Sequence, residues 1–227
     1  MKKHIVVLTG AGISAESGIK TFRDSDGLWE NYRIEEVATP GAWAANPQLV
    51  LNFYNMRRND ALKAQPNAAH IGLAEMEKDY DVTIITQNID DLHERAGSTN
   101  VVHLHGEIVK MRSVKNEHHY FPYEKDIQLG DLAPDGGQFR PHIVWFEEPV
   151  PMIEKAAAIA TDADIFVVIG TSLQVYPAAG LLHYAPPYST KYIIDKHIPP
   201  FDGINITAIE LPATEGVKKL REILNTL

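Results

Sequence analysis

Two glycines, Gly10 and Gly12, directly follow an apolar run at residues 5–8, and this spacing suits the binding of a diphosphate. The continuous β-branched run predicts a buried strand of a parallel sheet. Glycine lets the backbone turn sharply and approach a ligand, and the N–H groups of a helix that begins there attract phosphate. With Ala15 in third place, the pattern matches the dinucleotide fingerprint. A glycine turn that binds no ligand is the alternative.

Polar side chains follow two further apolar runs. The segment Gln-Asn-Ile-Asp at 87–90 comes after the run at 82–85, and Gly-Thr-Ser at 170–172 comes after 165–169. Ligands of open α/β sheets gather at the carboxyl ends of strands, so both segments are expected to face one cleft. The alternative is that they only form turns and cap the helices that follow.

A histidine, His105, ends a third apolar run and precedes Gly106. Imidazole titrates near neutrality, so it suits the role of general base toward a hydroxyl group. The chain has ten histidines, and one taken alone is a weak indicator of catalysis. His103 lies on the same side of the expected strand, because strand side chains repeat every second residue, and we expect it to be structural.

Tyr54 and Arg57 lie three residues apart in a segment rich in helix formers, which makes them neighbours on a helix. The planar guanidinium binds a carboxylate through two hydrogen bonds, and tyrosine adds a hydroxyl. The pair suits a pocket for an acidic group. Spacing alone, however, favours the alternative of a solvated basic helix face, since Arg58 is adjacent.

Apolar runs that alternate with helical patterns must position these groups. Strands are expected at 5–8, 81–86, 101–105, 142–146, 164–169 and 191–195, and helices at 70–78, 153–160 and from 214. The alternation predicts an α/β fold, a Rossmann-like parallel sheet with helices on both faces. We expect a single domain, 1–227, with its core at about 1–30, 71–106 and 141–227, an insertion of short helices at 31–70 and a surface module at 107–140.

The composition narrows the function classes. At 227 residues and 44% hydrophobic content, the chain can bury one α/β core. A formal net charge of −9 disfavours general nucleic-acid binding, which needs a basic surface. The absence of cysteine excludes disulfides, thiolate catalysis and Cys-ligated zinc. No apolar run approaches the ~20 residues of a membrane span. We expect a cytoplasmic monomer with no membrane or nucleic-acid partner.

Motifs at unbroken spacing over nearly the whole chain resemble the sirtuins, the NAD-dependent protein-lysine deacylases. They are GAGISAESGIKTFR at 10–23, GLW at 27–29, QNID at 87–90, HG at 105–106 and GTS at 170–172. The resemblance implies NAD as cofactor, with His105, Asn88 and Asp90 as catalytic residues. The cofactor-binding residues that it implies are Gly10, Ala11, Gly12, Ser14, Ala15, Glu16, Thr21, Phe22, Arg23, Trp29, Gln87, Asn88, Ile89, Asp90, Gly170, Thr171, Ser172, Asp195 and Ala213. Asp195 stands where sirtuins usually carry asparagine.

The segment FYNMRR at 53–58 resembles the sirtuin branch that removes succinyl and malonyl groups. The residues at 141–146 look like the family's substrate strand, to which a peptide could add by backbone pairing. The resemblance thus implies a set of substrate contacts, in which alanine widens the acyl pocket: Ala38, Tyr54, Arg57, Val144, Trp145 and Phe146.

The chain departs from the family at its structural zinc site. The two Cys-x-x-Cys pairs of the family align with Ser113 and Asn116 and with Leu132 and Asp135. Leucine carries no ligand atom, so we expect no metal there and a module held by packing. Metal binding by the nearby segment Glu-His-His at 117–119 is the weaker alternative.

The resemblance also implies a mechanism. The acyl oxygen attacks the nicotinamide ribose, nicotinamide leaves, and His105 deprotonates a ribose hydroxyl that captures the acyl carbon, while Phe22 shields the reactive carbon. The products are nicotinamide, acyl-ADP-ribose and the free lysine of a protein. Two other classes stay open: an NAD-dependent ADP-ribosyltransferase that uses the same pocket, and a non-catalytic sensor of NAD or ADP-ribose.

Overall fold

The apolar runs form a parallel sheet in a computed structural model, which describes residues 2–20, 32–198 and 205–226. Within these ranges, six strands lie in the order β3-β2-β1-β7-β8-β9, and each neighbouring pair is parallel. The strands are β1 (His4–Thr9), β2 (Asp81–Thr86), β3 (Val101–His103), β7 (Ile165–Ile169), β8 (Thr190–Ile194) and β9 (Ile206–Ile209). This is the strand order of a Rossmann sheet, with the topological switch point between β1 and β7.

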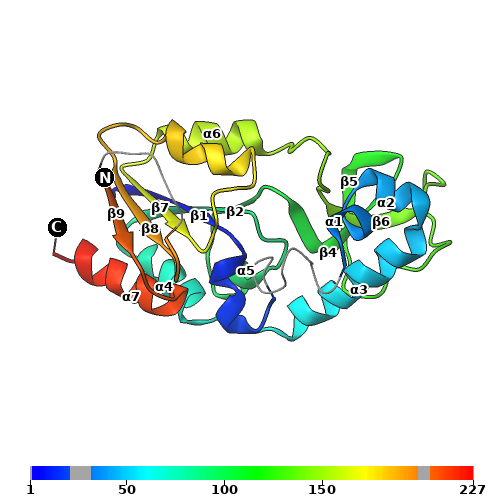
Figure 1. The fold of residues 1–227 in the computed structure, drawn as a ribbon, viewed down its shortest axis with the longest axis horizontal. Helices are drawn as coiled ribbons and strands as arrows, with labels where there is room; N and C mark the ends of the chain where they lie inside the picture. The colour runs from blue at the N-terminus through cyan, green and yellow to red at the C-terminus, as the bar shows by residue number, and fades with distance from the viewer. Residues whose placement is uncertain (1, 21–31, 199–204, 227) are drawn as a thin grey trace.

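Helices cover both faces of this sheet (Figure 1). On one face, α4 (Ala68–Met76) and α7 (Ala213–Leu224) pack on the side chains of Ile5 and Val7. On the other, α6 (Ile153–Thr161) and the 3-10 segment η4 (Ala178–Tyr184) pack on Val6 and Leu8. The predicted α/β class is confirmed, and the alternation of side chains along β1 explains how one apolar run serves two cores. Among the described residues no helix is both long and apolar enough to span a membrane.

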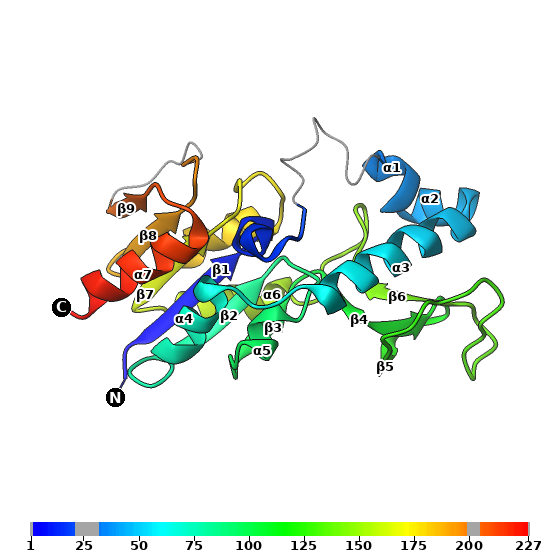
Figure 2. The same cartoon turned by 90° about the horizontal axis from the view of Figure 1, so that it is seen from below.

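A smaller unit lies at one end of the molecule, beyond the short helix α5 (Leu92–Arg95) (Figure 2). Its elements are the helices α1 (Ile34–Val37), α2 (Pro40–Ala45) and α3 (Pro47–Lys63) and the strands β4 (Gly106–Ser113), β5 (Asn116–Pro122) and β6 (Phe139–Ile143). In the described part of the chain, these strands form an antiparallel sheet in the order β5-β4-β6. One apolar core, which includes Phe53, Ile108 and Trp145, joins the helices to that sheet. The two segments that the sequence suggests as separate insertions therefore pack together.

Some elements differ from the sequence-based predictions. α3 has 17 residues where short helices are predicted, because Pro47 occupies its first turn, where proline is tolerated, and does not interrupt it. The turn after β1 leads into two 3-10 turns, Ala11–Ile13 and Ala15–Ser17, and not into the predicted α-helix. Gly18 follows them with a left-handed φ of 88°, which ends the helical run. The strand predicted at 142–146 is β6, which ends at residue 143.

Candidate active site

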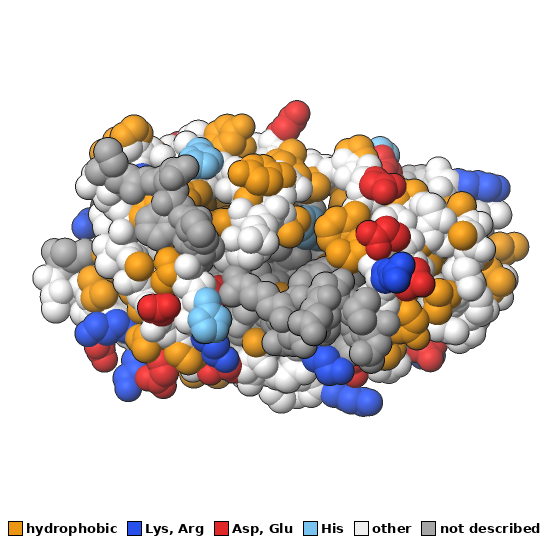
Figure 3. Space-filling view, in the orientation of Figure 1, with side chains coloured by type: hydrophobic (Ala, Val, Ile, Leu, Met, Phe, Trp, Pro, Cys, Tyr) orange, Lys and Arg blue, Asp and Glu red, His pale blue; other side chains and the backbone are white. Residues whose placement is uncertain are grey.

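A cavity of about 980 Å³ opens at the carboxyl ends of β1, β2 and β7. The parallel sheet side contributes Gly10, Asn88 and His105 to its lining, and the smaller unit contributes Arg57 and Trp145. Figure 3 views the hollowed face, where hydrophobic side chains border the opening. The position is the one at which Rossmann sheets bind ligands, and the volume suits a ligand of dinucleotide size.

The glycine turn is packed directly against the loop that follows β7. The Gly10 N–H donates to the Ile169 carbonyl at 3.0 Å, and the Gly12 N–H donates to the Gly170 carbonyl at 2.8 Å. A Cβ atom on Gly12 would lie 2.6 Å from the Gly170 Cα, and one on Gly10 would lie 2.8 Å from the Thr171 Cβ. The sequence interpretation, that glycine clears space for a ligand, is therefore incomplete, because the protein's own backbone occupies that space.

The buried hydroxyl of Ser14 links the side chains of Asn88 and Asp90, and we call these three residues the floor of the cavity. The Ser14 Oγ lies 3.1 Å from Asp90 Oδ2, 3.0 Å from Asn88 Nδ2 and 3.4 Å from His70 Nε2. The Asn67 N–H donates to His70 Nδ1 at 3.3 Å, so His70 carries its proton on Nε2 and donates it to Ser14. The Ser14 hydroxyl then donates its own proton to Asp90 Oδ2. Every hydrogen-bonding position of Ser14 is thereby used, which fixes the neighbouring amide and carboxylate.

Burial shifts the titration of both ionisable partners of Ser14. It lowers the pKa of His70 to about 4, so this ring is neutral at pH 7. It raises the pKa of Asp90, although the Leu92 N–H and the Ser14 hydroxyl bond the carboxylate and partly offset the effect. Burial thus favours the uncharged form of both groups.

His105 is oriented by the segment that ends β2. Its Nδ1 lies 3.0 Å from the Gln87 carbonyl oxygen, which can only accept, so Nδ1 carries the proton. Nε2 is then the basic nitrogen of a side chain that lines the cavity. Burial lowers the pKa of His105, although the bond to Gln87 opposes the effect, and the ring is therefore neutral at pH 7. The Gln87 side chain donates to Thr171 Oγ1 at 3.1 Å and so links the ends of β2 and β7.

The two arginines of α3 have different environments. Arg58 is 1% exposed, and its Nε donates to the Ile108 carbonyl at 2.8 Å, which ties α3 to β4. Arg57 is 8% exposed and lines the cavity, as do Tyr54 and Ala38. The alternative of a solvated basic helix face is therefore wrong, because the smaller unit covers this part of α3.

Trp145 is clamped from two sides. The guanidinium carbon of Arg140 lies 3.2 Å from the centroid of the Trp145 ring, and Glu148 Oε2 accepts a 2.8 Å hydrogen bond from the backbone N–H of Trp145. Glu148 also accepts hydrogen bonds of 2.8 and 3.1 Å from Arg140. This buried ion pair fixes one wall of the cavity.

The segment 144–146 offers less to a peptide strand than its resemblance implies. The Val144 N–H donates to the His105 carbonyl at 2.9 Å, and the Phe146 N–H donates to the Ala38 carbonyl at 3.0 Å. The N–H of Trp145 is bound to Glu148, so all three donors are engaged within the protein. Backbone pairing through these three groups is excluded in this conformation, although all three residues line the cavity.

Glu16 is the one described residue of the predicted site that lies outside the cavity lining. Its carboxylate accepts hydrogen bonds from the N–H and the Oγ1 of Thr214 at 3.1 and 2.9 Å, and so caps the start of α7. The other described residues of the prediction line the cavity, among them Ala11, Ala15, Ile89, Ser172, Asp195 and Ala213. The predictions for Thr21, Phe22, Arg23 and Trp29 lie outside the described residues.

Sequence reasoning missed several contributors. Lys196 and His197 line the cavity directly after Asp195, and Gln174 lies there two residues after the Gly-Thr-Ser segment. Their closeness to recognised motifs was the available signal. His70 gave no such signal, because only the fold brings its ring to Ser14.

The strand order, the glycine turn and the cavity at the switch point define a dinucleotide-binding α/β protein. The model of the Sir2 family matches residues 10–177, and the chain belongs to this family. An NAD-dependent protein deacylase of Bacteroides thetaiotaomicron is 53% identical over 229 residues, which cover 98% of each chain. One from Helicobacter pylori strain 26695 is 56% identical over 193 residues, which cover 85% of this chain and 84% of the relative.

Two solved structures of Sir2 proteins are similar to this chain in fold and sequence. A Sir2 homologue in complex with NAD has a TM-score of 0.86 and 39% identity, over 98% of this chain and 91% of that one. A complex of Sir2, a p53 peptide and NAD+ has a TM-score of 0.81 and 30% identity, over 100% and 95% of the two chains.

The positions that align with the family's zinc cysteines do not fit that metal. Leu132 has no ligand atom and forms an isolated β-bridge with Gln138. The Asn116 side chain accepts a hydrogen bond from the His118 N–H at 3.0 Å. His118 itself points to solvent with its side chain 89% exposed, and the ring of His119 stacks on Phe121. These residues give no convergent set of ligands at the tip of the module.

Proposed function

We infer that the protein is an NAD-dependent protein-lysine deacylase. The main supporting observation is that the glycine turn, the segment 87–90 and His105, whose Nε2 is basic, line one cavity. The smaller unit contributes another wall of the same cavity. The family membership and the deacylase relatives support the same conclusion.

The chemical groups that line the cavity suit the different parts of NAD. The Gly10–Gly12 turn and the loop at Gly170 form a backbone surface at the switch point, which suits a diphosphate. Asn88 and Asp90, fixed through Ser14, offer an amide and a carboxylate for ribose and carboxamide groups. Asp195 and Ala213 lie at the ends of β8 and α7 in the same cavity, where they suit the adenosine portion.

NAD bound here would supply a ribose carbon that can release nicotinamide and bond the acyl oxygen of the substrate. His105 would accept a proton from a ribose hydroxyl at Nε2, because its Nδ1 proton is hydrogen-bonded to the Gln87 carbonyl. Its lowered pKa keeps the ring unprotonated and ready at pH 7. The segment 87–90 would orient the sugar, and Trp145, held by Glu148 through its backbone N–H, lines the same cavity.

We further propose a preference for succinyl- or malonyl-lysine over acetyl-lysine. Arg57 brings a positive charge to a largely buried position on the cavity wall, beside Tyr54 on the same helix. The planar guanidinium binds a carboxylate through two hydrogen bonds, and a dicarboxylic acyl group offers such a carboxylate. The small side chain of Ala38 leaves room for that group.

The test is a comparison of kcat/KM for acetyl, malonyl and succinyl forms of one peptide, with NAD and with product analysis. We expect nicotinamide, acyl-ADP-ribose and free lysine, and the highest kcat/KM for an acidic acyl group. Transfer of ADP-ribose to protein without loss of acyl groups would instead favour the transferase alternative. NAD binding without any turnover would favour a sensor.

The expected cytoplasmic location and monomeric state are further proposals. Light scattering coupled to gel filtration tests the monomer directly. A tagged chain located by fractionation in its native host tests the cytoplasmic location.

A further inference from the structure

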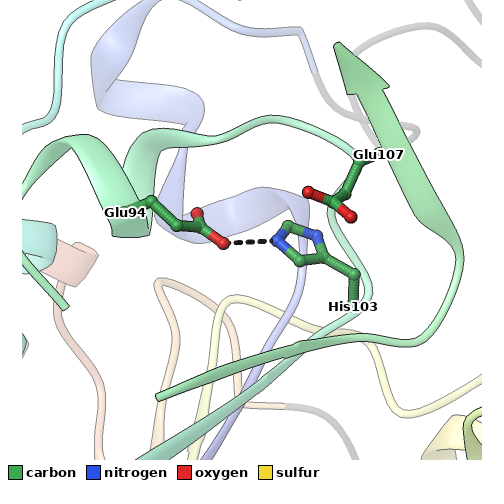
Figure 4. Close-up of side chains that lie close together, drawn as sticks. All are labelled: Glu94, His103 and Glu107. Atoms are coloured by element: carbon green, nitrogen blue, oxygen red, sulfur yellow. Dashed lines mark hydrogen bonds and ion pairs between the residues drawn. The ribbon is translucent and has the colours of Figure 1, made fainter. Parts of the chain in front are cut away.

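Both ring nitrogens of His103 face oxygen acceptors. Nδ1 lies 3.1 Å from the Asn88 carbonyl oxygen. Nε2 lies 2.7 Å from Glu94 Oε1, and Figure 4 shows this bond. A carbonyl and an ionised carboxylate can only accept, whereas a neutral imidazole has a single N–H. The two hydrogen bonds therefore form together only when the ring is an imidazolium.

The surroundings favour that charged ring. The His103 side chain is 8% exposed, and this burial lowers its pKa. The hydrogen bond to Glu94 and the charges of Glu94 and Glu107 outweigh burial, so the net shift of the pKa is upward. The other titratable or charged groups that face this cluster are Asp90, His93, Lys110 and His142.

A metal ion is not needed to explain this cluster. Glu94, His103 and Glu107 present atoms within 4.8 Å of one another, as three metal ligands would. However, Glu107 forms an ion pair with Lys110, and Glu94 forms one with His103. The charges of the cluster are thus balanced by the chain's own side chains.

The acceptor of the Nδ1 bond belongs to the floor of the cavity. The Asn88 N–H donates to Thr86 Oγ1 at 3.0 Å, and its side chain donates to Ser14 at 3.0 Å. The bond from His103 restrains the backbone carbonyl of Asn88. His105 holds the preceding carbonyl, that of Gln87, in the same way.

We propose that His103 is a positioning residue, which as an imidazolium holds the Asn88 carbonyl and thereby keeps the segment 87–90 in its working geometry. This role rests on the proposed function, because the segment matters for orienting the cofactor's ribose. His103 does not line the cavity, so it acts on the reaction through Asn88.

Deprotonation should release this restraint. The one remaining proton stays on Nε2, because the Glu94 carboxylate is the stronger acceptor. The Nδ1 lone pair then faces the Asn88 carbonyl oxygen, and two acceptors repel each other. The wild-type protein should therefore lose kcat/KM by about tenfold, equivalent to about 1.4 kcal/mol, as pH rises through the pKa of His103.

Three variants test the proposal through their pH profiles. Glu94→Gln can donate to Nε2, so the neutral ring keeps its Nδ1 proton on Asn88, and the alkaline fall should disappear. His103→Asn puts an amide donor where Nδ1 stands, so activity at pH 7 should persist without the alkaline fall. His103→Leu should be about tenfold less active at every pH. The matched control, His118→Leu, changes an exposed histidine and should behave as wild type.

The protonation state can be read without cofactor or turnover. In the long-range 1H–15N spectrum of the NAD-free protein at pH 7, both nitrogens of His103 should carry protons, because each faces an oxygen acceptor. A neutral His103 at pH 7, or wild-type kcat/KM with an unchanged pH profile in His103→Leu, would overturn the proposal. If His103→Leu does not fold, the Glu94→Gln profile and the spectrum decide. Absence of any deacylation by the wild type would refute the proposed function, while the spectrum would still test His103.

Discussion

The Ser113 hydroxyl donates a 2.8 Å hydrogen bond to Asp135 Oδ1. These two residues align with one cysteine from each of the two pairs that hold zinc in the family, so the bond joins the same two loops. The carboxylate also accepts from the Gly137 N–H at 2.8 Å, and the Lys115 N–H donates to the Ser113 hydroxyl at 3.1 Å. A small hydrogen-bonded cluster thus links the two loops.

The first prediction concerns metal independence of this module. EDTA should leave the thermal midpoint unchanged, whereas Asp135→Ala should lower it, because the two loops lose their shared acceptor. The control is Glu124→Ala, an exposed carboxylate of the same module. Differential scanning fluorimetry with and without EDTA measures both effects. A midpoint that falls in EDTA would mean that a metal does support the module.

The second prediction concerns acyl preference. Arg57→Met should lower kcat/KM for succinyl-lysine peptide by roughly 100-fold and leave deacetylation within a few-fold, because hydrogen bonds to charged groups contribute ~1.5–3 kcal/mol. Lys63→Met, an exposed basic residue at the end of the same helix, is the matched control. Equal losses on acetyl and succinyl peptides would contradict a carboxylate pocket.

The third prediction concerns the base. Only neutral His105 can accept a proton, and its pKa lies below 6.5, so kcat/KM should fall on the acid side only below that pH. His105→Ala should lower kcat/KM by at least ~100-fold. His183→Ala, at an exposed position, should have no effect. An acid limb centred above pH 6.5 would show that burial does not control this ring.

The fourth prediction concerns acid stability. His70 has a pKa of about 4 when folded against 6.5 in its ordinary state, so between these values the unfolded chain binds more protons. The free energy of unfolding should therefore fall as pH drops from 6.5 toward 4, by up to about 3 kcal/mol for a shift of about 2.5 units. In His70→Gln, which can still donate to Ser14, this dependence should be weaker. Urea unfolding at several pH values measures it, and parallel curves for both proteins would refute the role of His70.

Short-range sequence patterns predicted the parallel sheet and much of the site at its edge. The runs at β1, β2 and β7 are buried on both faces, so an unbroken apolar sequence marks β1 and β7, and a run interrupted only by Thr83 marks β2. Polar residues directly after such runs must lie at one edge of the sheet, which is why the segments 87–90 and 170–172 could be assigned to one cleft. The family resemblance supplied the cofactor.

The features that the sequence did not predict depend on contacts between residues far apart in the chain. The union of α3 with the small sheet depends on bonds such as Arg58 to the Ile108 carbonyl, between segments with no shared periodicity. Glu16 was predicted to bind the cofactor from its place in a motif, but its hydrogen-bond partner Thr214 lies 198 residues away in the sequence. The tautomers of His105 and His70 are likewise set by acceptors and donors that only the folded chain brings near.

The contact between Gly12 and Gly170 has a practical consequence for experiments. A side chain at Gly12 would force two loops apart before it met any nucleotide. Weak cofactor binding in such a variant would report a displaced scaffold and would say nothing about phosphate recognition. An inactive form that still holds NAD is better made at the imidazole of His105, away from that junction.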